Sequence, residues 1–197
     1  GTWVLSGNST YAGYTDIKAG ILRVTTSTAL GAGGHNGATM THIANGSALE
    51  LTGSITNSEH LHLAGAGPVG LGALRSISGD NAMTDSGYGL DGSGTVGVDA
   101  GTFTLTSFYD ASPSGRLTKI GAGSLILTAQ STHTAGTLIS AGTVRLTANN
   151  GLPLGGEVRV NGTAGPTLDL GGNSLDIGNG LLALGDATTG GGTIRNG

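Results

Sequence analysis

Histidine is the residue type whose spacing most suggests chemistry in this chain. Four of its five His residues, His35, His42, His60 and His62, fall between positions 35 and 62. The alternation of Leu and His in Glu59–Leu63 predicts a strand with both His side chains on its outer face, about 6 to 7 Å apart. Imidazoles bind divalent metals at about 2.1 Å within a supporting shell. A metal site at His42, His60 and His62 is one hypothesis, but we expect a solvated polar row without a metal or other cofactor.

Motifs for covalent catalysis are weak. The segment Thr84-Asp85-Ser86-Gly87 is similar to the nucleophile motif of trypsin-like proteases, but Thr84 stands where that motif has Gly. We therefore expect a turn at this segment. The Gly-x-Ser-x-Gly elbow of hydrolases does not occur in the chain, and the 12 acidic residues are scattered along it. These patterns predict a protein without enzymatic activity.

Phosphate and nucleic-acid binding find little support in the composition. Two segments, Gly65–Gly70 and Gly92–Gly97, fit Gly-x-Gly-x-x-Gly, but neither precedes a helix pattern that could hold a pyrophosphate, so we expect both to be corners. Eight Lys and Arg against 12 Asp and Glu give a net charge of -4, without a basic run. The absence of Cys removes disulfides and thiol chemistry. We expect neither nucleic acid as a partner nor insertion of this segment into a membrane.

The elements that position these side chains are expected to be short strands. Forty of the 197 residues are Gly, which argues against a helical protein because each Gly costs a helix about 1 kcal/mol relative to Ala. Pairs of apolar residues spaced by two recur between Gly-rich breaks, and this period is typical of strands. The pairs are Leu49/Leu51, Leu61/Leu63, Val96/Val98, Phe103/Leu105, Leu125/Leu127, Val144/Leu146, Val158/Val160, Leu168/Leu170, Leu175/Ile177 and Leu182/Leu184.

An internal repeat indicates how these strands are arranged. Residues 1–25 align with residues 123–147 without a gap, and ten positions are identical. Strands with only two apolar side chains are unstable alone, so they must stack in register over many coils. The pattern predicts one all-β solenoid over residues 1–197, with about 20 to 25 residues per coil and about 8 to 10 coils. Its repeat units would be about 1–116 and 117–197, the second incomplete.

The second copy of the repeat carries a family resemblance. Residues 117–146, LTKIGAGSLILTAQSTHTAGTLISAGTVRL, resemble the passenger-associated transport repeat of bacterial autotransporters, and residues 5–24 are similar. The second copy departs from the family pattern at Gln130 and His133, where Asn and Tyr are usual. The resemblance implies a right-handed parallel β-helix that is part of a longer passenger. It also implies export to the surface of a Gram-negative bacterium or secretion from it.

The motif residues read as scaffold rather than as reactive groups. The Gly residues would open corners, the apolar residues would fill the core, and residues 130–134 would cross a turn. The residues expected to form this scaffold are Gly121, Gly123, Leu125, Leu127, Thr132, Ile139, Gly142, Val144 and Leu146.

The expected function is that of a stalk in an autotransporter-type passenger, supporting export and adhesion or self-association, including fibre formation. Its expected partners are neighbouring coils or like chains, and host or cell-surface glycans. The alternative is a carbohydrate-active β-helix enzyme, which would show convergent carboxylates in a groove, or a carbohydrate-binding surface. The scattered acids could pair only through the coil register, which the sequence leaves open.

Overall fold

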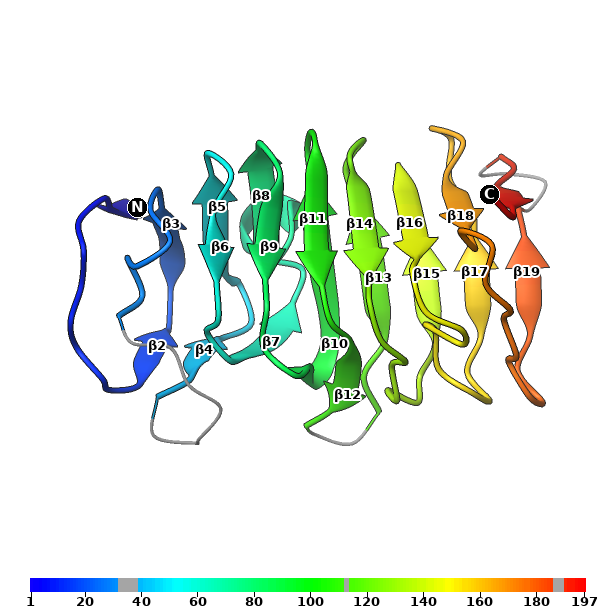
Figure 1. The fold of residues 1–197 in the computed structure, drawn as a ribbon, viewed down its shortest axis with the longest axis horizontal. Coiled ribbons are helices and arrows are strands. Elements are labelled where there is room, and N and C mark those ends of the chain that lie inside the picture. Colours follow the sequence, from blue (N-terminus) through cyan, green and yellow to red (C-terminus); the bar gives the residue numbers. More distant parts are fainter. Residues whose placement is uncertain (32–38, 112–113, 186–189) are drawn as a thin grey trace.

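Short parallel strands are stacked coil upon coil into a rod, with the N-terminal coil at one end and the C-terminal coil at the other (Figure 1). The computed structural model describes residues 1–31, 39–111, 114–185 and 190–197. Within these ranges the one helical element is the 3-10 turn η1, Pro68–Gly70. The all-β solenoid that the sequence predicts is confirmed. No described helix has the length and apolar character needed to span a membrane.

The strands form two sheets, one of 13 strands and one of seven. The main ladder of the larger sheet consists of β1 (Thr2–Leu5), β3 (Gly20–Val24), β5 (Ser47–Thr52), β8 (Leu74–Ser78), β10 (Tyr88–Val98), β13 (Leu117–Ile120), β15 (Thr137–Ile139), β17 (Val158–Val160) and β19 (Leu182–Leu184). Its side ladder consists of β2 (Thr15–Ile17), β4 (Thr41–Ile43), β7 (Leu61–Gly65), the first part of β10, and β12 (Phe108–Asp110).

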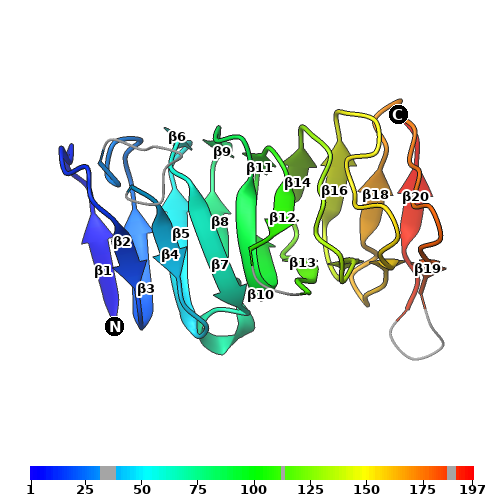
Figure 2. The same ribbon diagram turned by 90° about the horizontal axis from the view of Figure 1, so that it is seen from below.

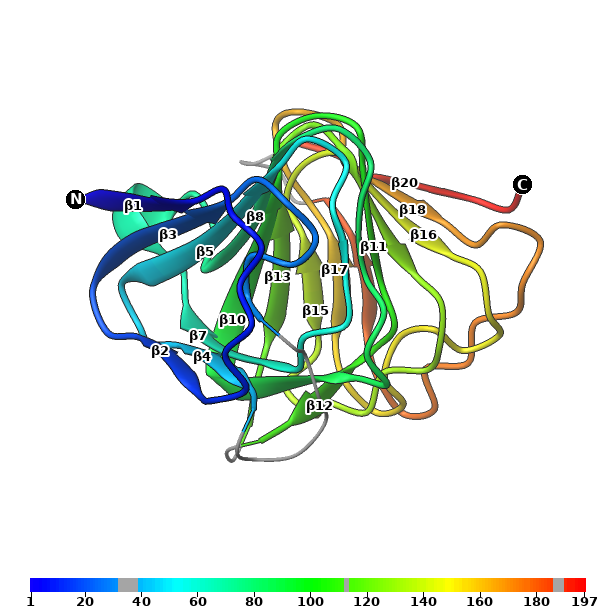
Figure 3. The same ribbon diagram turned by 60° about the vertical axis from the view of Figure 1, so that its left-hand side comes forward.

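The seven-stranded sheet faces the main ladder across the core. It consists of β6 (Thr56–Asn57), β9 (Asn81–Met83), β11 (Thr102–Leu105), β14 (Ser124–Leu127), β16 (Thr143–Leu146), β18 (Thr167–Asp169) and β20 (Thr193–Arg195). Figure 2 shows the strands following one another along the rod in chain order. In Figure 3, β11, β16 and β18 lie on one side of the core and β13, β15 and β17 on the other, with β2, β4 and β12 at the lower edge.

The coils differ in length because only the strands must stay in register. Thr2 lies opposite Ile21, whereas Gly20 lies opposite Ser47, so the second coil contains more residues than the first. The nine strands of the main ladder make eight such steps, so the solenoid has about eight turns. The loops between strands absorb the variation, which allows side chains from very different sequence spacings to meet on one face.

Strand β10 joins the side ladder to the main ladder. Residues 88–90 pair with β12, and residues 94–97 pair with β13. The strand bends between these parts at Gly92, whose φ of 81° favours glycine. The Gly92–Gly97 motif therefore forms a corner within a strand, and Gly65–Gly70 leads from the end of β7 into η1.

The core is a set of inward columns, one side chain per coil. Leu49, Leu74, Val96, Ile139 and Val160 are in one such column and are fully buried, with 0% exposure. Lys119 belongs to the same column, between Val96 and Ile139, and is also fully buried.

The buried amine of Lys119 finds hydrogen-bond acceptors in the carbonyl groups of two corners. Its Nζ donates to the carbonyl oxygens of Ile120 at 2.8 Å, Gly121 at 2.8 Å and Ala141 at 3.1 Å. Burial lowers the pKa of the amine to about 8. The sequence pattern does not indicate that Lys119 belongs to the core.

In the C-terminal coils the period-two pattern is wrong about a strand at Leu175/Ile177 and right about one at Leu182/Leu184. Leu175 and Ile177 lie outside any strand and are half-buried against the core. Leu182 and Leu184 do lie in a strand, β19, but they are 42% and 54% exposed. Strand β19 has a paired neighbour on one side, β17, so its inward face is not enclosed by a further coil of the described chain.

Candidate functional site

A polar column runs along the outer face of the side ladder. The register places Asp16 opposite His42, His42 opposite His62, His62 opposite Gly89, and Gly89 opposite Tyr109. Parallel strands in register stack equivalent side chains, so these positions lie on one face of five strands. The spacing of His42 and His62, close to one coil in the sequence, correctly indicated that the two could stack.

The carboxylates of Asp16 and Asp91 contact the two His residues of this column. His42 Nδ1 lies 3.1 Å from Asp16 Oδ1, and His42 Nε2 lies 3.4 Å from Asp91 Oδ2. The other oxygen of Asp91 lies 3.4 Å from His62 Nδ1. Lys18 Nζ lies 3.5 Å from Asp16. Asp91 thus connects His42 to His62, and the two imidazoles do not share a common point.

His60 is placed differently from the expectation. The alternation predicted an outer-face position, but β7 begins at Leu61, and His60 lies in the preceding corner, where strand alternation does not apply. It is buried, with 5% exposure. Its Nδ1 contacts the carboxylate of Asp85, and its Nε2 lies 3.0 Å from Tyr109 Oη.

Two imidazoles converge on one phenol oxygen. Tyr109 Oη lies 3.0 Å from His60 Nε2 and 3.0 Å from His62 Nε2. The two imidazole ring centroids are 5.3 Å apart. Gly89 makes this arrangement possible, because a Cβ at this position would lie 2.7 Å from the ring of His62. The sequence analysis identified neither Tyr109 nor Gly89, since their connection to His62 depends on the coil register.

Burial shifts the titration of several groups around this point. It lowers the pKa of His62 and so favours the neutral imidazole. It raises the pKa of Tyr109, and the charges of Asp85 and Asp91 raise it further. Beside them, burial raises the pKa of Glu59 to about 7, although Thr41 donates a hydrogen bond of 2.7 Å to its carboxyl group.

The predicted metal trio of His42, His60 and His62 does not converge on one point. Both nitrogens of His42 face carboxylates, whereas His60 and His62 share Tyr109. Among the residues that the structure describes, no group of three or more His, Cys, Asp or Glu is arranged to hold a metal ion. His35 lies outside the described residues.

The Thr84-Asp85-Ser86-Gly87 segment lies in the corner before β10. Asp85 is buried and contacts His60, while Ser86 is exposed. The two nitrogens of His60 are engaged by Asp85 and Tyr109, an arrangement that differs from the Asp-His-Ser relay of serine proteases.

A second polar column crosses the main ladder on its outer face. Arg23 Nη2 lies 2.7 Å from Glu50, Arg75 Nη1 lies 2.8 Å from the other oxygen of Glu50, and Arg75 Nε donates to Asp99 at 3.0 Å. Glu50 is only 1% exposed although its strand neighbours Leu49 and Leu51 point inward, because the two Arg side chains cover it. The partners in these three contacts are separated by unequal stretches of sequence, so the sequence alone did not reveal this ion ladder.

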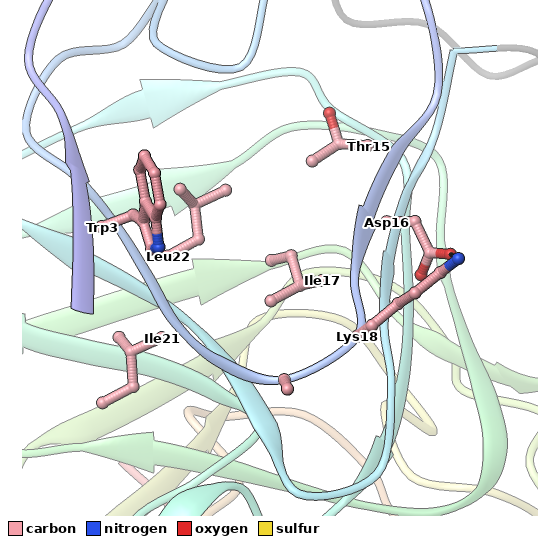
Figure 4. Close-up of a pocket in the computed structure, with 8 residues that line it drawn as sticks. Trp3, Thr15, Asp16, Ile17, Lys18, Ile21 and Leu22 are labelled. Atoms are coloured by element: carbon pink, nitrogen blue, oxygen red, sulfur yellow. Dashed lines mark ion pairs between the residues drawn. The ribbon is translucent and has the colours of Figure 1, made fainter. Parts of the chain in front are cut away.

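The surface of the described chain has hollows at the first coil and near β15 and β17. The first, of about 430 Å³, is at the first coil and is lined by Trp3, Ile17, Leu22 and the Asp16 and Lys18 pair (Figure 4). The second, of about 520 Å³, lies over β15 and β17 beside the start of β13 and is lined by Arg116, Leu138, Ser140, Arg159, Asn161, Gly162 and Thr163.

The structure places the predicted scaffold residues in two successive coils, because β14 pairs with β16. Leu125, Leu127, Ile139, Val144 and Leu146 are fully buried, and Thr132 is exposed in the turn between β14 and β15. At Gly142 the φ of 65° and the overlap of any Cβ with the carbonyl oxygens of Gly121 and Gly123 make a larger residue destabilising. A Cβ at Gly123 would lie 2.7 Å from the side chain of Val98.

The first copy of the repeat reproduces this local structure. Tyr11 Oη lies 3.0 Å from Thr15 Oγ1, and in the second copy His133 Nε2 lies 3.0 Å from Thr137 Oγ1. The departure from the family pattern at His133 therefore retains a hydrogen bond between aligned positions.

A parallel β-solenoid with such repeated coils defines a class of elongated repeat protein, and comparison with known proteins shows which proteins parts of the chain resemble. Residues 1–24 and 117–146 match the passenger-associated-transport-repeat family. A curated relative, the adhesin BmaC autotransporter of Brucella suis biovar 1 (strain 1330), is 34% identical over 122 residues, which cover 57% of this chain and 4% of the relative. No solved structure matches the chain. Two segments of the chain are therefore similar to autotransporter passenger repeats, as the sequence resemblance indicated.

Proposed function

We propose that the chain is a stalk segment of an adhesin-type passenger, exposed on the surface of a Gram-negative bacterium or secreted from it. In this proposal it supports export, holds other parts of the passenger away from the membrane, and contributes to adhesion or self-association. The chain spans about 4% of its curated relative, so the role of the whole protein is also part of the proposal.

The observation that carries the proposal is the continuity of the core along the rod. Inward columns of Leu, Val and Ile extend through successive coils, and each coil hydrogen-bonds to the next by parallel strand pairing. Such a rod transmits position over distance and needs no reactive group. The name of the relative, an adhesin, supports an adhesion-type passenger.

The carboxylates of the outer faces are bound in ways that fit a scaffold. Glu50 lies between two Arg side chains, Asp169 pairs with Arg195, and Asp110 accepts hydrogen bonds from Thr134 and Gly115. A glycosidase instead needs two carboxyl groups facing each other across a substrate, about 5 to 9.5 Å apart.

A carbohydrate-binding surface is the second candidate, and the hollow of about 520 Å³ over β15 and β17 favours it. Arg116 Nη2 and Arg159 Nη2 lie 3.2 Å and 2.6 Å from the two oxygens of Glu157. Two guanidinium groups therefore flank one carboxylate beside the Ser140 and Thr163 hydroxyl groups. Saccharides that carry carboxylate groups match this lining, because Arg binds carboxylates in a bidentate manner.

Adhesion is tested by coating beads with the purified chain and measuring their binding to cultured mammalian cells. We expect saturable binding by the folded chain and none by Leu127→Asp, whose core is disrupted. Beads coated with Arg116→Gln/Arg159→Gln separate the two candidates, because only the carbohydrate-binding surface predicts loss of binding in this variant. Equal binding by the folded chain and Leu127→Asp would contradict an adhesive role.

Self-association and catalysis have their own readouts. We expect light scattering to show oligomers or fibres that grow with protein concentration. Hydrolysis of polysaccharides, peptides or esters should show no turnover that Ser86→Ala or a single Asp→Asn change removes. Turnover lost with one carboxylate would replace the stalk proposal by the enzyme alternative.

Surface exposure is tested in the native bacterium. An antibody against the folded chain should label intact cells or detect the protein in the culture medium, and external protease should remove the label from cells. Detection only after lysis would contradict this localisation.

A further inference from the structure

We propose that His60, His62 and Tyr109 form a binding site for a divalent transition-metal ion, with Cu²⁺ or Zn²⁺ as the fitting ions. The site lies on the side ladder where β7, β10 and β12 meet, and it is independent of the proposed stalk function. Its three donor atoms come from segments far apart in the sequence, brought together by the coil register.

The first argument is geometric. The imidazole nitrogens of His60 and His62 each lie 3.0 Å from the same oxygen atom, Tyr109 Oη. Two ligand atoms about 2.1 Å from one metal ion are about 3.0 Å apart when their bonds meet at a right angle, and about 3.4 Å apart at a tetrahedral angle. Each of the two nitrogen–oxygen separations therefore fits a pair of neighbouring ligands on one ion.

The second argument concerns what lies behind each imidazole. A metal-binding His usually donates its other ring N–H to a carboxylate, which orients the ring and directs the free nitrogen at the metal. His60 Nδ1 contacts Asp85, and His62 Nδ1 lies 3.4 Å from Asp91. Both rings thus have a carboxylate support, and both supported rings present Nε2 to the same point.

The third argument counts protons. A phenol has one proton, so Tyr109 can donate to only one of the two Nε2 atoms. With each Nδ1 proton directed at its carboxylate, the second imidazole can donate to Tyr109 only by carrying an extra proton. A metal ion in place of these protons satisfies all three atoms with neutral imidazoles.

The surroundings make the site well shaped for a small ion. His60 is buried, His62 and Tyr109 are half-buried, and the missing side chain at Gly89 leaves room for the His62 ring. His42 is held by Asp16 and Asp91 and does not belong to the ligand set. As the metal–oxygen bond forms, the phenol proton leaves to solvent. Nitrogen ligands favour Cu²⁺ over Zn²⁺ among divalent ions.

The experiment titrates the tag-free chain, complete as printed, with Cu²⁺ alone and with Zn²⁺ alone, by calorimetry in a weakly coordinating buffer. We expect one ion per chain with micromolar or tighter affinity, and proton release on binding. The Cu²⁺ complex should show two nitrogen ligands by electron paramagnetic resonance and a visible phenolate-to-copper charge-transfer band.

Four variants assign the ligands. His60→Ala and His62→Ala should each weaken binding by more than the roughly 10- to 100-fold that loss of a supporting carboxylate costs, and Asp85→Asn should fall within that range. Tyr109→Phe should remove the charge-transfer band and weaken binding. The matched control, His42→Gln, should keep the affinity within about twofold, because it changes a neighbouring imidazole outside the ligand set.

Several results would overturn the proposal. They are the absence of stoichiometric binding, an unchanged affinity in His60→Ala or His62→Ala, an unchanged charge-transfer band in Tyr109→Phe, and an equal loss in His42→Gln. Circular dichroism confirms that each variant is folded. If a variant does not fold, the nitrogen count and the charge-transfer band of the unmodified chain decide the question alone.

Discussion

The two copies of the repeat can be compared coil for coil. In the first copy, β1 pairs with β3 and Thr2 lies opposite Ile21; in the second, β14 pairs with β16 and Ser124 lies opposite Thr143. The two steps are equal in length. The next coil closes in the same way, since Thr25 N donates to Leu5 O at 3.1 Å and Thr147 N donates to Leu127 O at 3.0 Å. One repeat therefore specifies one coil.

The copies occupy different faces of the solenoid. Strands β1 and β3 belong to the main ladder, with β2 on the side ladder, whereas β14 and β16 belong to the seven-stranded sheet, with β15 on the main ladder. Equivalent strands of the two copies therefore belong to different faces of the solenoid. The repeat determines local turn geometry and core positions, and the neighbouring coils determine which face each strand joins.

The copies also differ in burial. Trp3 is 79% exposed and the aligned Leu125 is fully buried; Tyr11 is 39% exposed and the aligned His133 is fully buried. Strand β14 lies between β11 and β16, whereas β1 pairs only with β3 in the described structure. The same substitution should therefore change the free energy of unfolding by different amounts in the two copies.

The largest difference is expected for an acid in the core. Leu127→Asp should lower the free energy of unfolding by several kcal/mol or abolish folding, because an unpaired carboxylate enters a column between Leu105 and Leu146. The aligned change Leu5→Asp should cost less, since Leu5 is half-buried. Urea denaturation followed by circular dichroism measures both. Equal costs would contradict the ranking of the copies.

The next difference is a pH effect that only the second copy should show. Burial lowers the pKa of His133 to about 4, from 6.5 when unfolded. Between these values the unfolded chain binds more protons, so the stabilisation is complete above pH 6.5 and is lost as the pH falls toward 4. The loss is about 3 kcal/mol for a shift of this size.

The measurement compares the unmodified chain with His133→Gln over this pH range. Comparing two proteins cancels the opposite contribution of Glu59, whose raised pKa makes stability fall as the pH rises from about 4.5 to about 7. Tyr11→His is the control in the first copy, and its stability should change little with pH because position 11 is partly exposed. Parallel pH profiles for the unmodified chain and His133→Gln would contradict the burial of His133.

A smaller effect is expected at the corner glycine. Gly142→Ala should cost about 1 to 3 kcal/mol, because φ is 65° and the Cβ would overlap two carbonyl oxygens. Gly20→Ala should cost less, since its Cβ would lie 2.6 Å from the oxygen of Gly1, a terminal residue that can move. Gly46→Ala, with φ of 83° and no neighbour within 4 Å, isolates the backbone cost of about 1 to 2 kcal/mol. Thermal melts should reproduce the order Gly142, Gly20, Gly46.

The smallest effect is expected on the outer face, where the two copies should agree. Val4→Thr and Ile126→Thr should each change stability by less than about 1 kcal/mol, because these side chains lie between inward neighbours and point outward. Damage comparable to that of Leu127→Asp would mean that the assignment of inward and outward positions is shifted by one residue.

The coil architecture was predictable because its signals are local. The apolar pairs Leu125/Leu127 and Val144/Leu146 and the ungapped repeat fix strands and corners without knowledge of contacts. Lys119 was missed because a charged residue within a strand pattern reads as outward, and its three carbonyl partners arise only after two corners meet. His60 was misplaced because the sequence does not show where β7 begins.

The candidate site depended on register and was therefore out of reach. Tyr109 follows His62 by two coil steps of unequal length, so no fixed period connects them. Glu50 meets Arg23 and Arg75 for the same reason. A cluster within residues 35–62 was visible in the sequence, but Tyr109, on which His60 and His62 converge, was not.

The unequal coil steps have a mechanical consequence. Strands run across the rod, so the hydrogen bonds between coils point along it, and a pull on its two ends loads the coil interfaces in series (Figure 1). Tensile strength then depends on the weakest interface rather than on the sum of all of them. When a coil detaches, the rod lengthens by the extended length of that coil. This length is shorter for the step from β1 to β3 than for the step from β3 to β5. The rod would extend under tension in discrete steps of unequal length.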